Sequence, residues 1–268
     1  MLQDKTTRKN IIWATSSYEY LGNYFEAKSQ ITVDLVCGMN RDLIQPRIYK
    51  DSASQAERTK KHAEVFTPSW VCNRMNNHCD EVWFGRAGVF NTEKGTGWLS
   101  GEEKIVFPEK RTWRDYVDSR RLEITCGEAP FLVSRYDAST GEYIPPKERI
   151  GQLDRKLRVV SENAADESEW MKWTLRAFQS TYGYEFQGDN LLIGRINLLM
   201  TFVDYLADRW GREPLDCELR KLANIIAWNL WQMDGLKHVV PFGVPEENCE
   251  QLSFIEAPHV NERQMTCR

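Results

Sequence analysis

The alternation of short apolar runs with amphipathic segments between residues 112 and 236 constrains the fold more than any other feature. LEIT at 122–125 and YGYEF at 182–186 read as short strands. Helical patterns surround them, over 112–121, over 166–180 and from Asp189, a capping candidate, to about 208. Strands that alternate with helices build a parallel sheet covered by helices. The sequence therefore predicts an α/β fold of the doubly wound kind.

Other segments give weaker patterns. ITVDLVCG at 31–38 reads as a strand, and 52–66 as a polar helix that stops at Thr67-Pro68, because proline disfavours helix in the residue before it. Ser69 can begin a new helix. We expect a turn-rich insertion over residues 132–168 and a further helix over residues 214–226. Periodicity leaves open whether that last helix continues or yields to a strand IIAWNLWQ. We expect an N-terminal extension over 1–55 and a main domain over 56–268. The sequence leaves open whether that domain is incomplete at its C-terminus.

Composition excludes several classes of protein. With 41% apolar and 28% charged residues, the chain has an ordinary globular mix. It contains no run of eighteen apolar residues and no secretion signal at its start, so we expect a cytoplasmic protein without a membrane partner. A net charge of −4 argues against coating nucleic acid by bulk attraction but leaves a local basic groove possible. The basic clusters at 58–62 and 110–114 are interleaved with acids and read as solvated faces.

Seven scattered cysteines indicate reduced thiols. Cys72, His78 and Cys79 lie close together in sequence, but no second pair follows at zinc spacing, so we expect no metal site. Cys126 reads as a small buried residue rather than a reactive one, because no histidine or lysine is near it in sequence.

Acidic residues and a glycine mark the ends of the predicted strands. Gly127 follows the first strand and permits a sharp bend close to a ligand. Glu185 closes the second strand, where an acid can accept the hydroxyls of a ribose. Asp234 precedes a glycine and can receive an adenine amino group, or it can form a common Asp-Gly turn. Glu123 can orient an amino group or be a solvent-exposed acid at a strand end, and Thr67-Pro68 can close over a ligand or only break a helix.

The order of these pieces resembles the amino-methyltransferases of restriction-modification systems that act on adenine in DNA. AEVFTP is similar to the family's "G-x-x-Y/F-T-P" segment, and EITCGEAPF to its cofactor turn "D/E-P-x-C-G-x-G-x-F". GYEFQGDNLLIGRINL and NLWQMDGL resemble its next two motifs, with Gly183, Arg195, Asn197, Leu198, Asn229 and Leu236 among the matches. The resemblance implies that the main domain over 56–268 is methyltransferase-like, with a Rossmann-like methyltransferase fold, S-adenosylmethionine as cofactor and DNA as partner. The cofactor-binding residues that it implies are Phe66, Thr67, Pro68, Glu123, Cys126, Gly127, Phe131, Glu185 and Asp234.

Two departures from the family pattern bear on activity. Ile124 and Ala129 stand where the family has proline and a second glycine. The catalytic tetrapeptide "N/D/S-P-P-Y/F", which holds a flipped adenine, is absent, and the only Pro-Pro pair is Pro145-Pro146. The sequence therefore names no catalytic residue. The alternatives are a catalytically inactive subunit that docks a restriction nuclease or a second methyltransferase subunit, and a general scaffold.

Overall fold

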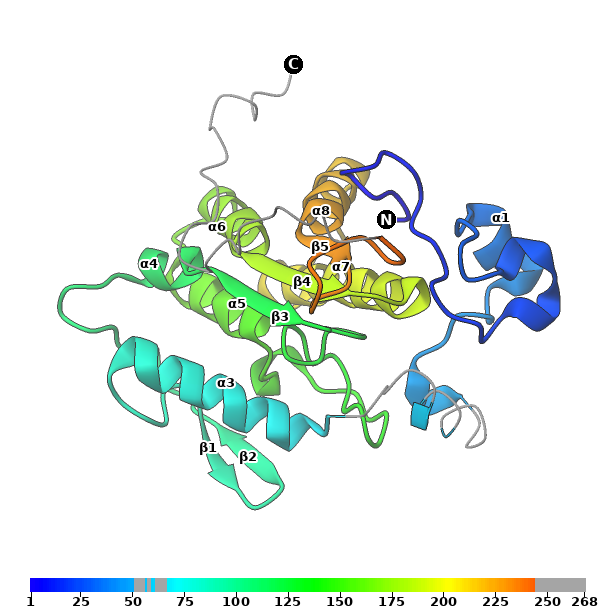
Figure 1. The fold of residues 1–268 in the computed structure, drawn as a ribbon. Helices are drawn as coiled ribbons and strands as arrows, with labels where there is room; N and C mark the ends of the chain where they lie inside the picture. Colours follow the sequence, from blue (N-terminus) through cyan, green and yellow to red (C-terminus); the bar gives the residue numbers. More distant parts are fainter. Residues whose placement is uncertain (51–55, 57–58, 61–66, 244–268) are drawn as a thin grey trace, which may run out of the picture.

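A parallel sheet and a separate antiparallel hairpin are the two sheets of the computed structural model, which describes residues 1–50, 56, 59–60 and 67–243 (Figure 1). The parallel sheet has the strand order β3-β4-β5 and comprises β3 (Arg121–Ile124), β4 (Thr181–Glu185) and β5 (Leu230–Gln232). The hairpin pairs β1 (Asn91–Lys94) with β2 (Gly97–Ser100). The strands predicted at 122–125 and 182–186 are confirmed as β3 and β4. The hairpin is a feature that the sequence did not indicate.

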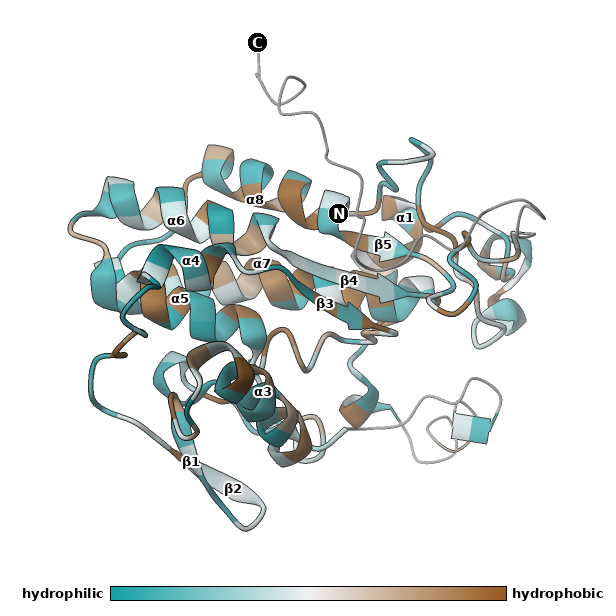
Figure 2. Cartoon of the chain, turned by 60° about the vertical axis from the view of Figure 1, so that its left-hand side comes forward, coloured by the Kyte–Doolittle hydropathy of each residue, from teal (hydrophilic) through white to brown (hydrophobic). Residues whose placement is uncertain are grey.

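Helices surround the parallel sheet. Figure 1 shows α5 and α7 behind the strands, with α6 and α8 beside them. The longer helices are α3 (Ser69–Phe84), α5 (Gln152–Asn163), α6 (Glu167–Gln179), α7 (Gly188–Trp210) and α8 (Asp216–Asn229). In Figure 2 hydrophobic and hydrophilic residues alternate along α7 and α8, as expected of helices with one apolar side. The structure is thus mixed α/β, with a small parallel sheet.

The open question about residues 225–232 has a definite answer. Helix α8 ends at Asn229, and β5 begins at the next residue. The Asn229 side chain donates hydrogen bonds to the carbonyls of Phe178 and Thr181, at 2.8 and 3.0 Å. These bonds fasten the end of α8 to the start of β4, and the chain changes from helix to strand at that point.

Helix α5 lies inside the predicted turn-rich insertion, so that prediction was wrong for its second half. The helix buries three charged residues in succession, Asp154, Arg155 and Lys156, which disguise its apolar side in the sequence. Each is hydrogen-bonded to residues distant in sequence: the Arg155 guanidinium donates to the carboxylate of Asp80 at 2.5 Å, the Lys156 Nζ donates to the Ser119 carbonyl at 2.6 Å, and Asp154 Oδ2 accepts the Ser134 amide at 2.8 Å. Buried charges are tolerated only with such partners.

Short helices complete the described part of the chain. Helix α4 (Trp113–Asp118) carries the capping box of Thr112 and Asp115, in agreement with the helix predicted there. Helix α1 spans Val33–Val36, so the strand predicted over 31–38 was wrong. The remaining 3-10 turns are Glu19–Leu21, Asn23–Phe25, Gly38–Asn40, Arg47–Tyr49 and Pro146–Glu148. Within the described ranges, no helix combines the length and apolar character needed to cross a bilayer.

The N-terminal residues pack against the end of the parallel sheet. The Ile12 amide donates to the Gln232 side chain at 2.8 Å, and that side chain donates back to the Ile12 carbonyl at 2.7 Å. The Gly188 amide donates to the Trp13 carbonyl at 2.9 Å. Ile11, Trp13 and Ile31 are buried in the same core as the helices. The extension predicted over 1–55 therefore contributes to the core, while most of the predicted helix over 52–66 lies outside the described residues.

Candidate functional site

Several of the predicted site residues, among them Gly127 and Glu185, lie at the edge of the sheet where its three strands end. All three strands are parallel, so their carboxyl ends meet at one edge. The Gly127 amide donates to Glu185 Oε2 at 2.8 Å, directly across from β3 to β4. The Gln187 amide donates to Glu185 Oε1 at 3.0 Å, and Glu185 is only 6% exposed. Two residues that are 58 positions apart in the chain thus share a hydrogen bond at this edge.

Glu123 lies at the end of β3 with a carboxyl oxygen that has no partner. Its Oε2 is buried and accepts no hydrogen bond from any described residue. Burial raises the pKa of Glu123 well above its ordinary value, backbone N–H groups of Phe131 and Leu132 oppose that shift, and the charge of Glu185 adds to it. The sequence left open whether Glu123 contacts a ligand or is exposed to solvent. The structure instead places a shielded carboxyl beside the turn.

Cys126 is a packing residue of the turn. It is 1% exposed, and its Sγ would lie 3.0 Å from a methyl group added to Gly183 on β4. Burial, followed by the charges of Glu123 and Glu185, raises the thiol pKa well above its ordinary value. A neutral buried thiol is a poor nucleophile, so Cys126 and Gly183 fit together as small groups that bring β3 and β4 close.

The Thr67-Pro68 corner lies at the start of α3. Pro68 is the residue preceding α3, and the Cys72 thiol donates to the Thr67 carbonyl at 3.8 Å. Burial raises the pKa of Cys72, and the charge of Glu123 raises it further. Phe66, the other predicted residue of this corner, lies outside the described residues.

Phe131 follows the turn after β3 and connects it to α3 and α5. Its carbonyl accepts a hydrogen bond from the Asn76 side chain of α3 at 3.0 Å and another from the Gln152 amide, which begins α5, at 2.8 Å. The helix that follows the Thr67-Pro68 corner therefore holds the turn after β3 directly. Asn76 is 1% exposed, and sequence reasoning gave no signal for it because it lies among other polar residues of α3.

Asp234 reaches the edge but is committed to a turn. The Met233 amide donates to the Glu185 carbonyl at 2.9 Å, which joins the residues after β5 to β4. The Asp234 carboxylate accepts the amides of Leu236 and Lys237, both at 3.1 Å, and the Lys237 ammonium lies 3.7 Å from it. These contacts are those of an Asp-Gly turn, one of the two readings that the sequence left open.

Arg195, a match to the family motif, and Asp189, the predicted helix cap, lie in α7 and both have structural partners. Arg195 is fully buried and donates to the Leu230 carbonyl at 2.6 Å, so it fastens α7 to the start of β5. The prediction that Asp189 caps this helix was wrong, because α7 begins at Gly188 and is preceded by Gln187. Asp189 lies in the first turn of α7, where its carboxylate accepts the Tyr18 hydroxyl at 2.9 Å and lies 3.6 Å from the Lys50 ammonium.

Sequence reasoning missed a cluster of polar side chains behind the turn. Glu128 Oε1 accepts the Arg47 amide at 2.6 Å, and its Oε2 accepts the Tyr136 hydroxyl at 2.5 Å. The Asn197 side chain donates to the Glu128 carbonyl at 3.0 Å and to the Tyr136 oxygen at 3.1 Å. These residues come from four separate segments, and only Asn197 carried a signal, as a match to the family motif.

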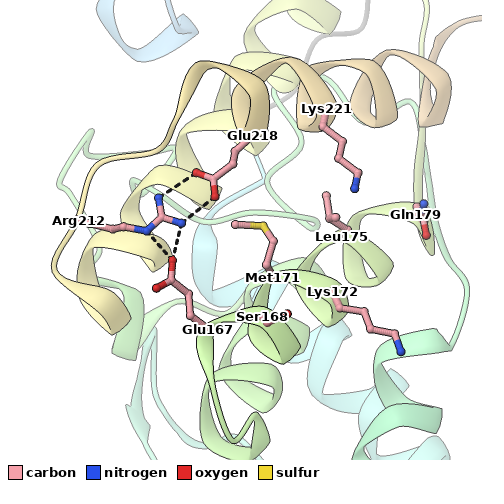
Figure 3. A pocket seen from close by; sticks show the side chains of 9 residues that line it. All are labelled: Glu167, Ser168, Met171, Lys172, Leu175, Gln179, Arg212, Glu218 and Lys221. Atoms are coloured by element: carbon pink, nitrogen blue, oxygen red, sulfur yellow. Dashed lines mark hydrogen bonds and ion pairs between the residues drawn. The ribbon is translucent and has the colours of Figure 1, made fainter. Parts of the chain in front are cut away.

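A surface hollow lies away from this edge. It encloses about 630 Å³ between α6 and α8 and contains none of the predicted site residues. Figure 3 shows Arg212 between Glu167 and Glu218, with ion pairs of 2.6 and 2.7 Å that satisfy its charge, and Met171 and Leu175 at the centre. Among the described residues, no group of three histidine, cysteine or acidic side chains is placed to hold a metal ion.

Comparisons of the chain with protein-family models, with curated proteins and with solved structures found no match.

Proposed function

We propose that the edge formed by β3, β4 and β5 binds S-adenosylmethionine in a Rossmann-like arrangement. On this proposal the chain is a DNA adenine N6-methyltransferase, or the cofactor-binding portion of one, in a restriction-modification or phage-defence system. The observation that carries the proposal is the hydrogen bond of 2.8 Å between the Gly127 amide and Glu185. It supports the proposal because ligands of parallel α/β sheets bind at the carboxyl ends of the strands. At that edge of this sheet the bend at Gly127 meets the carboxylate of Glu185.

The charges at this edge suit a cationic cofactor. S-adenosylmethionine carries a sulfonium and an ammonium group, and each favours the ionised form of a nearby carboxyl. Glu185, held by two backbone amides, is oriented to accept ribose hydroxyls, since a carboxylate offers about four acceptor positions. The buried, unpartnered Oε2 of Glu123 is the acceptor proposed for the methionine ammonium. Its raised pKa implies that cofactor binding releases a proton from this group.

The proposed chemistry is direct attack of the adenine amino nitrogen on the sulfonium methyl. The new N–C bond forms as the C–S bond breaks, S-adenosylhomocysteine leaves, and the amino nitrogen then loses a proton. Such a transfer requires alignment and exclusion of water more than a strong base. We assign no catalytic residue, because the sequence lacks the family's catalytic tetrapeptide. Its only Pro-Pro pair, Pro145-Pro146, forms the start of the 3-10 turn Pro146–Glu148, and the Pro146 carbonyl accepts the Tyr205 hydroxyl of α7.

A catalytically inactive subunit is the second candidate. Its sequence support is the missing tetrapeptide. Its structural support is a set of exposed apolar side chains in the N-terminal residues, where Tyr20 is 79% and Tyr24 77% exposed. Exposed aromatic groups of this kind are typical of docking surfaces for other proteins. A restriction nuclease or a second methyltransferase subunit would be the partner of such a surface.

The test is calorimetric titration of S-adenosylmethionine into the intact chain and two Glu185 variants. Removing a charged acceptor costs about 1.5–3 kcal/mol, so Glu185→Ala should weaken binding by roughly tenfold to a hundredfold. Glu185→Gln keeps an oxygen that can accept the Gly127 amide but removes the negative charge. Comparison of the two variants therefore distinguishes an effect of the charge from a failure to fold. Glu102→Ala, an exposed acid away from the edge, should bind as the unaltered chain does.

Methyl transfer to adenine-containing DNA is then measured with the chain alone and with the product of the neighbouring gene. Transfer supports the enzyme, and binding without transfer in either setting supports the inactive subunit. An unaltered chain that does not bind the cofactor would refute the proposed site.

A further inference from the structure

The turn after β3 holds three residues in the left-handed backbone region. Thr125, Gly127 and Ala129 have φ values of 56°, 54° and 66°. Glycine adopts this region freely, whereas a residue with a Cβ is strained there. Ala129 is fully buried, so the turn keeps this conformation in the tightly packed interior. Something in the surrounding structure must hold Ala129 in a shape that glycine would adopt without cost.

Helix α7 packs closely against the same turn. A methyl group added to Gly194 would lie 3.1 Å from the Gly127 carbonyl oxygen and 3.6 Å from the Ala129 Cβ. This contact fixes one side of the turn but supplies no directional force on the backbone of residue 129. Backbone hydrogen bonds also hold residue 129: its amide donates to the Cys126 carbonyl at 2.7 Å, and its carbonyl accepts the amides of Leu132 and Val133 at 3.1 and 2.9 Å. Further directional contacts come from Glu128, which lies between the left-handed positions 127 and 129.

Glu128 connects the turn to three other segments. Its carboxylate accepts the Arg47 amide at 2.6 Å from the N-terminal residues and the Tyr136 hydroxyl at 2.5 Å from the loop before α5. Its backbone carbonyl accepts the Asn197 side chain of α7 at 3.0 Å. The Arg47 amide is the first of a 3-10 turn and so has no partner within that turn. Both the side chain and the backbone of Glu128 are thereby held by hydrogen bonds.

We propose that Glu128 is a positioning residue that holds the turn in its ligand-binding shape and compensates for alanine at position 129. The peptide unit between Glu128 and Ala129 is held at both of its polar groups, because its carbonyl accepts from Asn197 and its amide donates to the Cys126 carbonyl. The Glu128 side chain anchors this unit to Arg47 and Tyr136. The cofactor-binding role of the turn rests on the proposed function. The compensation itself is a property of the folded chain, so it can be measured without any ligand.

The experiment is a double-mutant cycle between Glu128→Ala and Ala129→Gly, read by S-adenosylmethionine affinity. Glu128→Ala should weaken binding about tenfold, the change expected for loss of a charged acceptor. Adding Ala129→Gly to that variant should restore affinity to within about threefold of the unaltered chain, because glycine needs no support in this conformation. Glu128→Gln should bind nearly normally, since its amide can accept from Arg47 and donate to Tyr136. Glu142→Ala, an exposed acid of the same loop, is the matched control.

A second readout separates this proposal from the cofactor assignment. Melting temperatures of the four members of the cycle, without ligand, should be non-additive, with Ala129→Gly more favourable in the Glu128→Ala chain than in the unaltered one. If the unaltered chain does not bind the cofactor but the melting temperatures are coupled, the cofactor assignment fails and the positioning role stands. Additive melting temperatures, or no rescue of affinity by Ala129→Gly, would overturn the positioning role, because a residue that only stabilises the fold shows no specific coupling to position 129.

Discussion

Docking of the N-terminal residues over α7 makes a sharp prediction at Gly188. A methyl group added to Gly188 would lie 2.0 Å from the Ile12 carbonyl oxygen, far inside van der Waals contact. The obstacle is backbone, so the N-terminal segment must move. Three hydrogen bonds depend on its position: from the Gly188 amide to Trp13, and the two between Ile12 and Gln232.

The magnitude follows from these contacts. Three hydrogen bonds at about 1 kcal/mol each amount to about 3 kcal/mol, and alanine regains up to about 1 kcal/mol of helix propensity. Gly188→Ala should therefore lower the free energy of unfolding by about 2 kcal/mol, which corresponds to a fall in melting temperature of roughly 4–8 °C for a chain of this size.

Thermal and urea unfolding measure the loss, and hydrogen exchange at Ile12 and Trp13 locates it. Gly97→Ala in the hairpin is the matched control, because its nearest neighbour, the Lys94 carbonyl oxygen, would lie at an ordinary 3.7 Å. Equal stability of the two variants, with unchanged exchange at Ile12 and Trp13, would refute the docking of this segment on α7.

Two further predictions concern titratable groups. Because the pKa of Glu123 is raised in the folded chain, its protonated form contributes stability that is fully present below about pH 4 and is lost as pH rises through the raised pKa. Glu123→Gln cannot ionise, so its advantage in free energy of unfolding should grow from pH 5 to pH 8 in urea titrations; parallel pH curves would contradict the buried carboxyl. In alkylation followed by mass spectrometry, the exposed Cys37 and Cys217 should react readily, whereas Cys72 and Cys126 should react only after unfolding; rapid labelling of either buried thiol in the folded chain would contradict their placement.

Local patterns predicted the elements around the sheet well where the buried side of an element is apolar. Strands β3 and β4 and helices α6 and α7 follow such patterns. Asp166, the first residue of the predicted helix 166–180, caps α6, whereas the predicted cap Asp189 lies inside α7. Helix α5 escaped prediction because Arg155 and Lys156 are buried with partners that no local pattern reveals. The short apolar run at 31–38 was misread as a strand, since such a run fits either element.

The sequence by itself determined that acids and a glycine follow the strands of a parallel sheet, because strand, turn and helix patterns depend on neighbouring residues. Only the tertiary structure decided which of these groups are available to a ligand. It shields Glu123, joins Glu185 to the Gly127 amide and commits Asp234 to its own turn. It also brings Glu128 to Arg47, 81 positions away in the chain. Hydrogen bonds and burial depend on atoms that meet only after the chain has folded, and no spacing along the sequence records them.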